Sequence, residues 1–139
     1  MHRILVLLVL FLATITARAE NAILVLDESG SMWAQLGGKT RIEIARAVIG
    51  DMLAQVPAER ALGLVAYGHR REGDCSDIEE IVPVGTDRAT ILAAVNTMKP
   101  KGKTPLTDGV RFAAQKLNYT ERGATVILVS DGAESCNRD

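Results

Sequence analysis

The stretch Ala22-Ile23-Leu24-Val25-Leu26-Asp27-Glu28-Ser29-Gly30-Ser31 decides the fold. Residues 22–26 form a short apolar run, which predicts a buried strand. Asp27, Ser29 and Ser31 would then lie at its carboxyl end, where open α/β sheets bind their ligands. Carboxylate and hydroxyl oxygens suit Mg²⁺, Mn²⁺ or Ca²⁺ rather than zinc. Three ligands do not fill the coordination shell of such a cation, so others must come from elsewhere in the chain, from water or from a partner.

Composition indicates one globular domain. The chain has 139 residues, of which 47% are hydrophobic and 24% charged, with a formal net charge of −1. There is no basic block, and an aromatic content of 4% argues against a nucleic-acid-binding surface. The segments Gly38-Lys39-Thr40 and Gly102-Lys103-Thr104 resemble the end of a phosphate-binding loop, but each lacks the glycine five positions earlier. Nucleotide binding is therefore disfavoured.

Residues 1–19 read as a signal peptide. Arg3 precedes a mostly apolar stretch from 4 to 15, which is too short to span a bilayer comfortably, and Ala17-Arg18-Ala19 has the form of a cleavage site. We expect an exported protein, periplasmic or extracellular, whose mature domain is residues 20–139 and has no membrane span after cleavage. Export makes Cys75 and Cys136 disulfide candidates. The sequence leaves open whether they pair with each other, pair elsewhere or stay free.

The rest of the chain alternates strand and helix. Apolar runs predict strands at 61–67, 78–84 and 125–129, the second at a sheet edge because it contains Pro83. Helices are predicted from the Thr40/Glu43 capping box to Pro57, from Asp87 to Pro100, and after Thr104 as cap with Pro105 as first helical residue. This alternation predicts a mostly parallel α/β sheet flanked by helices. Asp131, which follows the last strand, should share an edge of the sheet with the serines.

Three motifs follow one another along the chain: D-x-S-x-S, then G-K-T-P-L, then an apolar strand that runs into S-D-G. With these motifs in this order, the chain resembles a von Willebrand factor type A domain with a metal-ion-dependent adhesion site. The resemblance extends to exported bacterial members through the run from Tyr67 to Glu79. It implies a Rossmann-like fold and five metal-site residues, which are Asp27, Ser29, Ser31, Thr104 and Asp131.

The resemblance also implies a role for each residue. Ser29 and Ser31 would bind Mg²⁺ (or Mn²⁺ or Ca²⁺) directly, and Thr104 would do so directly or through water. Asp27 and Asp131 would act mainly through water and through hydrogen bonds to the hydroxyls. An open position would accept a Glu or Asp carboxylate from a partner protein.

The family's fold continues beyond the point where this chain ends, with further strands and a closing helix. The strand at 125–129 is apolar throughout and typical of a central strand, yet here it would lie at a sheet edge. We therefore expect a domain truncated after its fourth strand, either a fragment of a longer protein or the product of a truncated open reading frame.

Several residues near the motif have two readings. By alternation Glu28 faces away from Asp27 and is expected to be solvated, with a role as a further metal ligand as the alternative. Asp108 would favour the dipole of the third helix or support the metal site. Trp33 would anchor a partner or pack over the serine loop. The stretch His69-Arg70-Arg71 would be a solvated loop or contact an acidic partner.

We interpret the sequence as a non-enzymatic, metal-dependent protein-binding module. One alternative is a metal-dependent hydrolase or phosphatase, but Ser29 stands where an aspartyl-phosphate enzyme needs a second acid, and no Ser-His-acid set is evident. The other alternative is a structural domain of a larger surface protein whose metal site is vestigial.

Overall fold

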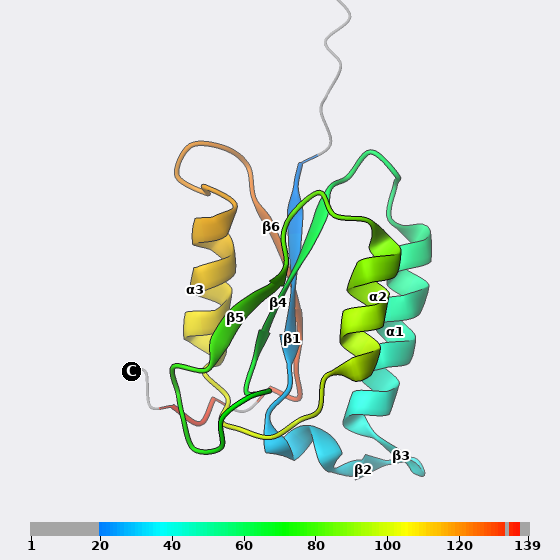
Figure 1. Cartoon of the computed structure of the whole chain (residues 1–139), viewed down its shortest axis with the longest axis vertical. Helices are drawn as coiled ribbons and strands as arrows, with labels where there is room; N and C mark the ends of the chain where they lie inside the picture. The colour runs from blue at the N-terminus through cyan, green and yellow to red at the C-terminus, as the bar shows by residue number, and fades with distance from the viewer. Residues whose placement is uncertain (1–19, 133, 137–139) are drawn as a thin grey trace, which may run out of the picture.

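A four-stranded sheet forms the centre of the molecule (Figure 1). The computed structural model describes residues 20–132 and 134–136, so the predicted signal peptide lies outside the described residues. The strand order is β5-β4-β1-β6, with bounds β1 (Ala22–Asp27), β4 (Leu62–Tyr67), β5 (Ile78–Val82) and β6 (Thr125–Val129). Strands β4, β1 and β6 run parallel and β5 is antiparallel. The predicted α/β fold with a mostly parallel sheet is confirmed.

Helices cover both faces of the sheet. The helices α1 (Arg41–Gln55) and α2 (Arg88–Thr97) pack on one face, and α3 (Leu106–Lys116) packs on the other (Figure 1). Every residue of β1 is buried, and alternate side chains enter the two apolar layers. Leu24 and Leu26 join the layer under α1 and α2, while Ile23 and Val25 join the layer under α3. The central position of β1 follows, since both of its faces need apolar cover.

A short connection leads from β1 to α1. It comprises a 3₁₀ turn η1 (Gly30–Trp33) and a small hairpin of β2 (Gln35–Leu36) and β3 (Lys39–Thr40). The predicted capping box at the start of α1 is present. The Glu43 N–H donates to Thr40 Oγ1 at 3.3 Å, and the Thr40 N–H donates to the Glu43 carboxylate at 2.7 Å. This cap begins α1 at the residue that follows the hairpin.

The start of α3 differs from the prediction. The helix begins at Leu106, and its N-cap is Pro105 rather than Thr104, without a side-chain cap of its own. Glu134, far along the chain, accepts the N–H of Thr107 at 3.0 Å instead. The local pattern predicts Thr104 as the cap, whereas a long-range contact satisfies this helix end.

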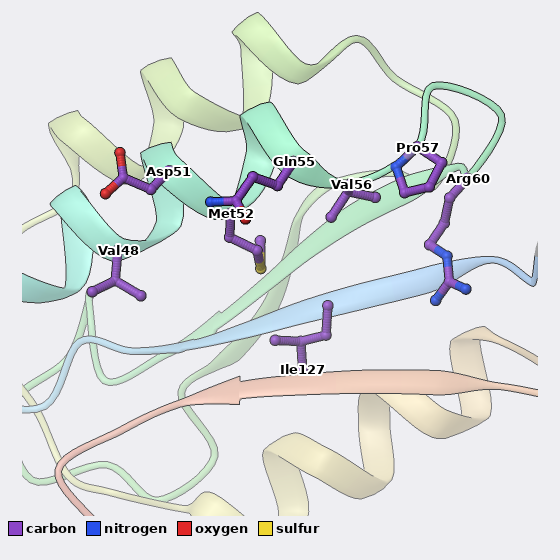
Figure 2. A pocket seen from close by; sticks show the side chains of 8 residues that line it. All are labelled: Val48, Asp51, Met52, Gln55, Val56, Pro57, Arg60 and Ile127. Atoms are coloured by element: carbon purple, nitrogen blue, oxygen red, sulfur yellow. The ribbon is translucent and has the colours of Figure 1, made fainter.

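Strand β6 lies at the edge of the sheet within the described residues, as predicted. It pairs with β1 on one side, and Leu128 is 40% exposed. Figure 2 shows an open groove between β6 and α1, where Ile127 of β6 lies opposite Met52 and Val48 of α1. In the part of the chain that the structure describes, no helix combines the length and apolarity needed to cross a membrane.

Candidate metal site

Asp27 organises the carboxyl end of β1. Its side chain is fully buried. One carboxylate oxygen, Oδ1, accepts the N–H of Ser29 at 2.9 Å, and the other accepts the hydroxyl of Ser130 at 2.6 Å. Asp27 therefore shapes the loop after β1 and ties it to the residue that follows β6.

The two serines of the motif converge. Ser29 Oγ lies 3.1 Å from Ser31 Oγ, with Ser29 buried and Ser31 exposed. The 3₁₀ turn that begins at Gly30 brings the two hydroxyls together, because its first residues fold back within one short turn. The pair thus offers two neutral oxygens between the interior and the surface.

The segment before Thr104 lies along the serine loop. Gly102 forms a parallel bridge with Ser29, and its carbonyl accepts the N–H of Gly30 at 3.0 Å. The Lys101 N–H donates to the carbonyl of Glu28 at 2.9 Å. Thr104, two residues after Gly102, is buried, with 4% of its surface exposed. Backbone pairing therefore brings the loop before α3 to the end of β1.

Gly68, directly after β4, allows this close approach. Its φ of +72° favours glycine, and a Cβ added there would lie 2.5 Å from the carbonyl oxygen of Lys103 and 3.1 Å from the Cα of Ser29. A side chain at this position would push apart the two segments that carry the candidate ligands. The loop after β4 therefore helps to build the site without supplying a ligand of its own.

Asp131 follows β6 and faces the same edge. Its Oδ2 accepts a charged hydrogen bond from Arg41 at 2.7 Å. Its Oδ1 is buried and has no hydrogen-bond partner among the residues that the structure describes. Such an oxygen is costly unless something binds it. Sequence reasoning missed Arg41, because its pairing partner lies 90 positions away and no local pattern links the two.

Glu28 is buried, so the prediction of a solvated side chain is wrong. The residue is fully inaccessible, and within the described part of the chain neither carboxylate oxygen has a hydrogen-bond partner. Burial raises the pKa of Glu28 from its ordinary 4.5 to about 7, although the positive charge of Arg46 opposes the rise and Asp27 adds to it. The alternation of side chains was read correctly, but the face opposite Asp27 is covered by α1 and α2 and is not open to water.

The structure also places the other residues that have two readings. Trp33 packs over the neighbouring loop, since its indole N–H donates to the carbonyl of Pro100 at 2.8 Å, yet 48% of its surface stays exposed. In the loop after β4, Arg70 pairs with the buried Asp77 at 2.7 Å. Asp108 lies in the first turn of α3 and pairs with Arg111 at 3.0 Å. The arginine loop is thus tied to its own acids.

A disulfide joins Cys75 to Cys136, with an S–S distance of 2.06 Å and a Cα–Cα distance of 5.7 Å. It connects the loop after β4 to the segment after β6. The sequence had left this pairing open among three alternatives. Proximity of the two loops, which only the folded sheet creates, selects one of them.

The residues present fit a hard divalent cation. They offer hydroxyl and carboxylate oxygens, one of which, Asp131 Oδ1, is buried without a partner. Across residues 20–132 and 134–136, no group of three or more His, Cys, Asp or Glu side chains is arranged to hold a metal. A cation at this edge would therefore depend on the hydroxyls of Ser29, Ser31 and Thr104 as much as on carboxylates.

Known proteins share this architecture. The chain is 26% identical over 129 residues to the YwmD protein of Bacillus subtilis (strain 168), an alignment that covers 86% of this chain and 58% of YwmD. The chain thus spans little more than half the length of that relative. Among solved structures, the pilus adhesin SpaC from Lactobacillus rhamnosus GG superposes with a TM-score of 0.67 at 23% identity, covering 86% of this chain and 16% of SpaC.

The three N-terminal domains of the type V pili tip protein Mfa5 from Porphyromonas gingivalis superpose with a TM-score of 0.61 at 19% identity, covering 84% of this chain and 20% of that three-domain chain. At these identities the structural matches establish the fold. The model of the von Willebrand factor type A domain matches residues 22–134, which is most of the chain. The protein therefore belongs to the von Willebrand factor type A domain family.

Proposed function

We propose that this domain is an exported, non-enzymatic module that binds a partner protein through a divalent cation. Asp27, Ser29, Ser31, Thr104 and Asp131 would hold Mg²⁺, or Mn²⁺ or Ca²⁺ in its place, and a Glu or Asp carboxylate of the partner would complete the coordination. The observation that carries the proposal is the buried, unpartnered Oδ1 of Asp131, at the same sheet edge as the paired serine hydroxyls.

The hydrogen bonds support a division of labour among these residues. Both oxygens of Asp27 are already engaged, by the Ser29 N–H and the Ser130 hydroxyl, so its part is to orient the loop. Among residues 20–132 and 134–136, the hydroxyls of Ser29 and Ser31 bond only to each other, which leaves them available to a cation. Neutral ligands leave the cation's charge largely uncompensated, which favours an incoming carboxylate.

The surface around the site favours an acidic partner segment. Lys101 and Lys103 are exposed, flank Gly102 on the segment that leads to Thr104, and have no ion-pair partner among the described residues. The half-exposed ring of Trp33 is held beside them by its bond to Pro100. A partner carboxylate on the metal would thus have positive charge and an aromatic face next to it.

The similar structures support a binding function and an exported location. SpaC is described as a pilus adhesin and Mfa5 as a type V pili tip protein, and both carry this fold at a cell-surface appendage. A hydrolase or phosphatase remains the alternative reading, but Ser29 occupies the position of the second acid that an aspartyl-phosphate enzyme needs. Purified protein that hydrolyses a phosphate ester in Mg²⁺ would favour that alternative.

Calorimetric titration of the purified chain with Mg²⁺ and Mn²⁺ tests the proposal. We expect saturable binding that is lost in Ser29→Ala and in Asp131→Ala. Ser76→Ala is the matched control, since this exposed serine bonds to Asp74 in the neighbouring loop and should leave binding unchanged. Circular dichroism shows whether each variant is folded. A folded wild-type chain that binds neither cation would overturn the metal-dependent mechanism and leave a structural domain.

A further inference from the structure

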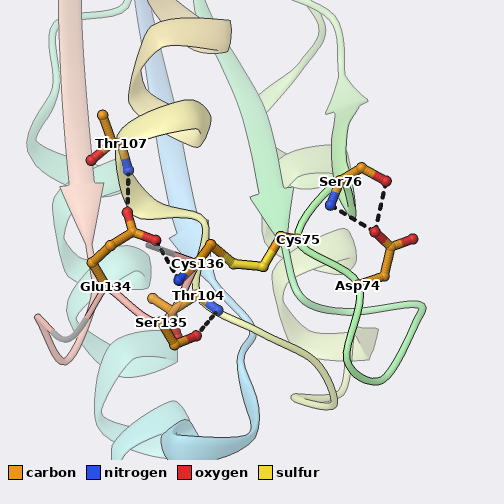
Figure 3. The surroundings of a disulfide bond; sticks show 8 residues. All are labelled: Asp74, Cys75, Ser76, Thr104, Thr107, Glu134, Ser135 and Cys136. Atoms are coloured by element: carbon orange, nitrogen blue, oxygen red, sulfur yellow. Dashed lines mark hydrogen bonds between the residues drawn. A yellow bond between two sulfur atoms is a disulfide. The ribbon is translucent and has the colours of Figure 1, made fainter. Parts of the chain in front are cut away.

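The segment 134–136 fastens the loop that carries Thr104. The Thr104 N–H donates to Ser135 Oγ at 2.8 Å, and the Ser135 N–H donates back to the Thr104 carbonyl at 3.1 Å. Figure 3 shows Ser135 and Thr104 facing one another beside the disulfide. This reciprocal pair holds the backbone on both sides of the Thr104 side chain.

Glu134 holds the other side of the same corner. Its carboxylate accepts the N–H of Thr107 at 3.0 Å and the N–H of Cys136 at 3.0 Å (Figure 3). Because Pro105 provides no side-chain cap, Glu134 supplies the acceptor that the first turn of α3 lacks. A carboxylate is also favoured there by the helix dipole.

The disulfide fixes this segment in place. Cys136 is bonded to Cys75 in the loop after β4, 61 positions away in the sequence. Besides the disulfide, the hydrogen bonds described above hold Glu134 and Ser135 on the α3 corner. Each of these bonds contributes about 1 kcal/mol. We name the segment Glu134–Cys136, with its bond to Cys75, the disulfide clamp.

We propose that the disulfide clamp positions Thr104 for the metal, so that cation affinity depends on the Cys75–Cys136 bond. The inference rests on the proposed metal site. With the bond intact, Thr104 is held before the cation arrives. With the bond reduced, part of the binding free energy must reorder the corner, which weakens binding. Residues that orient metal ligands typically change affinity by 10- to 100-fold when they are removed.

The relation is reciprocal. If oxidation strengthens Mg²⁺ binding by some factor, then saturating Mg²⁺ favours the disulfide over the dithiol by the same factor. Reduction by a dithiol proceeds through attack of its thiolate on one cysteine sulfur. The S–S bond breaks, its electron pair leaves on the other cysteine, and that thiolate takes up a proton. The second thiol of the reductant then displaces the first cysteine, so the chain gains two electrons and two protons while the reductant becomes a disulfide.

The test measures Mg²⁺ affinity of the purified chain before and after reduction by dithiothreitol. We expect affinity to fall about tenfold on reduction, and by a similar factor in the double variant Cys75→Ser/Cys136→Ser. In a dithiothreitol redox buffer, Mg²⁺ should shift the oxidised-to-reduced ratio by the same factor. Hydrogen exchange should show lost protection at the amides of Thr104 and Thr107 and retained protection in β1. Equal Mg²⁺ affinity in the oxidised and the folded, reduced chain overturns the inference.

Two variants test the clamp with the disulfide intact, in case the reduced chain unfolds. Ser135→Ala and Glu134→Ala should each weaken Mg²⁺ binding severalfold, whereas Ser76→Ala, in the loop that carries Cys75, should not. Unchanged affinity in both clamp variants overturns the inference. If the oxidised wild-type chain binds no cation, the proposed metal site fails instead, and exchange at Thr104 and Thr107 still shows whether the disulfide holds this corner.

Discussion

Two neighbouring loops at the carboxyl end of the sheet each contain a buried carboxylate, and they differ in how that carboxylate is hydrogen-bonded. The loop after β1 (residues 28–34) contains Glu28, and the loop after β4 (residues 68–77) contains Asp77, both fully inaccessible. No described residue donates a hydrogen bond to either oxygen of Glu28. Asp77 accepts the N–H groups of Arg70 and Arg71 at 2.7 and 2.9 Å and the Arg70 guanidinium at 2.7 Å.

The pKa values follow this difference. Burial alone would raise the pKa of Asp77, but the hydrogen bonds from Arg71 and Arg70 outweigh it and the pKa is lowered. Burial raises the pKa of Glu28 to about 7 because no hydrogen bond offsets it. The loop after β4 thus satisfies its acid internally and acts as a scaffold. The loop after β1 leaves the oxygens of its buried acid without a hydrogen bond from the described residues.

The largest expected effect concerns Asp77, the fully bonded acid of the loop after β4. Asp77→Ala should lower the free energy of unfolding by about 4 kcal/mol, because it leaves the Arg70 and Arg71 donors without their buried acceptor. Urea denaturation followed by circular dichroism measures the change. Asp74→Ala removes a partly exposed acid of the same loop that pairs with Arg71, and its effect should be much smaller. Equal losses in the two variants would show that Asp77 is not the centre of this loop.

The second prediction concerns Glu28 in the cation-free chain, kept in EDTA. A carboxyl whose pKa is higher in the folded than in the unfolded state binds more protons when folded, so stability falls as pH rises. The loss should develop between pH 4.5 and about 7 and reach at most about 3 kcal/mol. Urea denaturation of the wild type and of Glu28→Gln at pH 4.5 and pH 8 isolates this contribution. A pH dependence that persists unchanged in Glu28→Gln would assign it to other groups.

The smallest expected effect concerns the ion pair between Arg41 and Asp131 at the proposed metal site. Arg41 places a positive charge on Asp131, and we expect it to compete with a bound cation. Arg41→Met should strengthen Mg²⁺ binding about threefold, or about 0.7 kcal/mol, since a half-exposed ion pair is weak. Lys116→Met is the matched control, because Lys116 has similar exposure and pairs with Glu80 away from the site. Weaker binding in Arg41→Met would show that Arg41 instead orients Asp131 for the cation.

Much of the fold was readable from the sequence because its signals are local. The apolar run at 22–26 and the capping box at Thr40 and Glu43 each depend on a few adjacent residues, and both appear in the structure as predicted. The edge position of the strand at 78–82 followed from Pro83. The end of each predicted strand then indicated which side chains share an edge. That Asp27, Ser29, Ser31, Thr104 and Asp131 hold a metal stays a prediction.

Other properties were set by contacts that no local pattern contains. Thr104 does not cap α3, because Glu134, 27 positions beyond Thr107, provides the acceptor. Glu28 is buried, because α1 and α2 cover its face of the sheet. These errors share one cause. A local motif shows which hydrogen bonds a residue is able to make, but tertiary packing decides which donor or acceptor lies within reach.

By itself the sequence determined the alternation of strand and helix, the parallel sheet and the placement of oxygen side chains at strand ends, since hydrophobic periodicity and turn chemistry act over short distances. Only the tertiary structure decided which cysteines pair, that Arg41 reaches Asp131, and that one buried acid is fully bonded while its neighbour is not. Those outcomes depend on which loops the folded sheet brings together. No local sequence pattern links residues that are 61 or 90 positions apart.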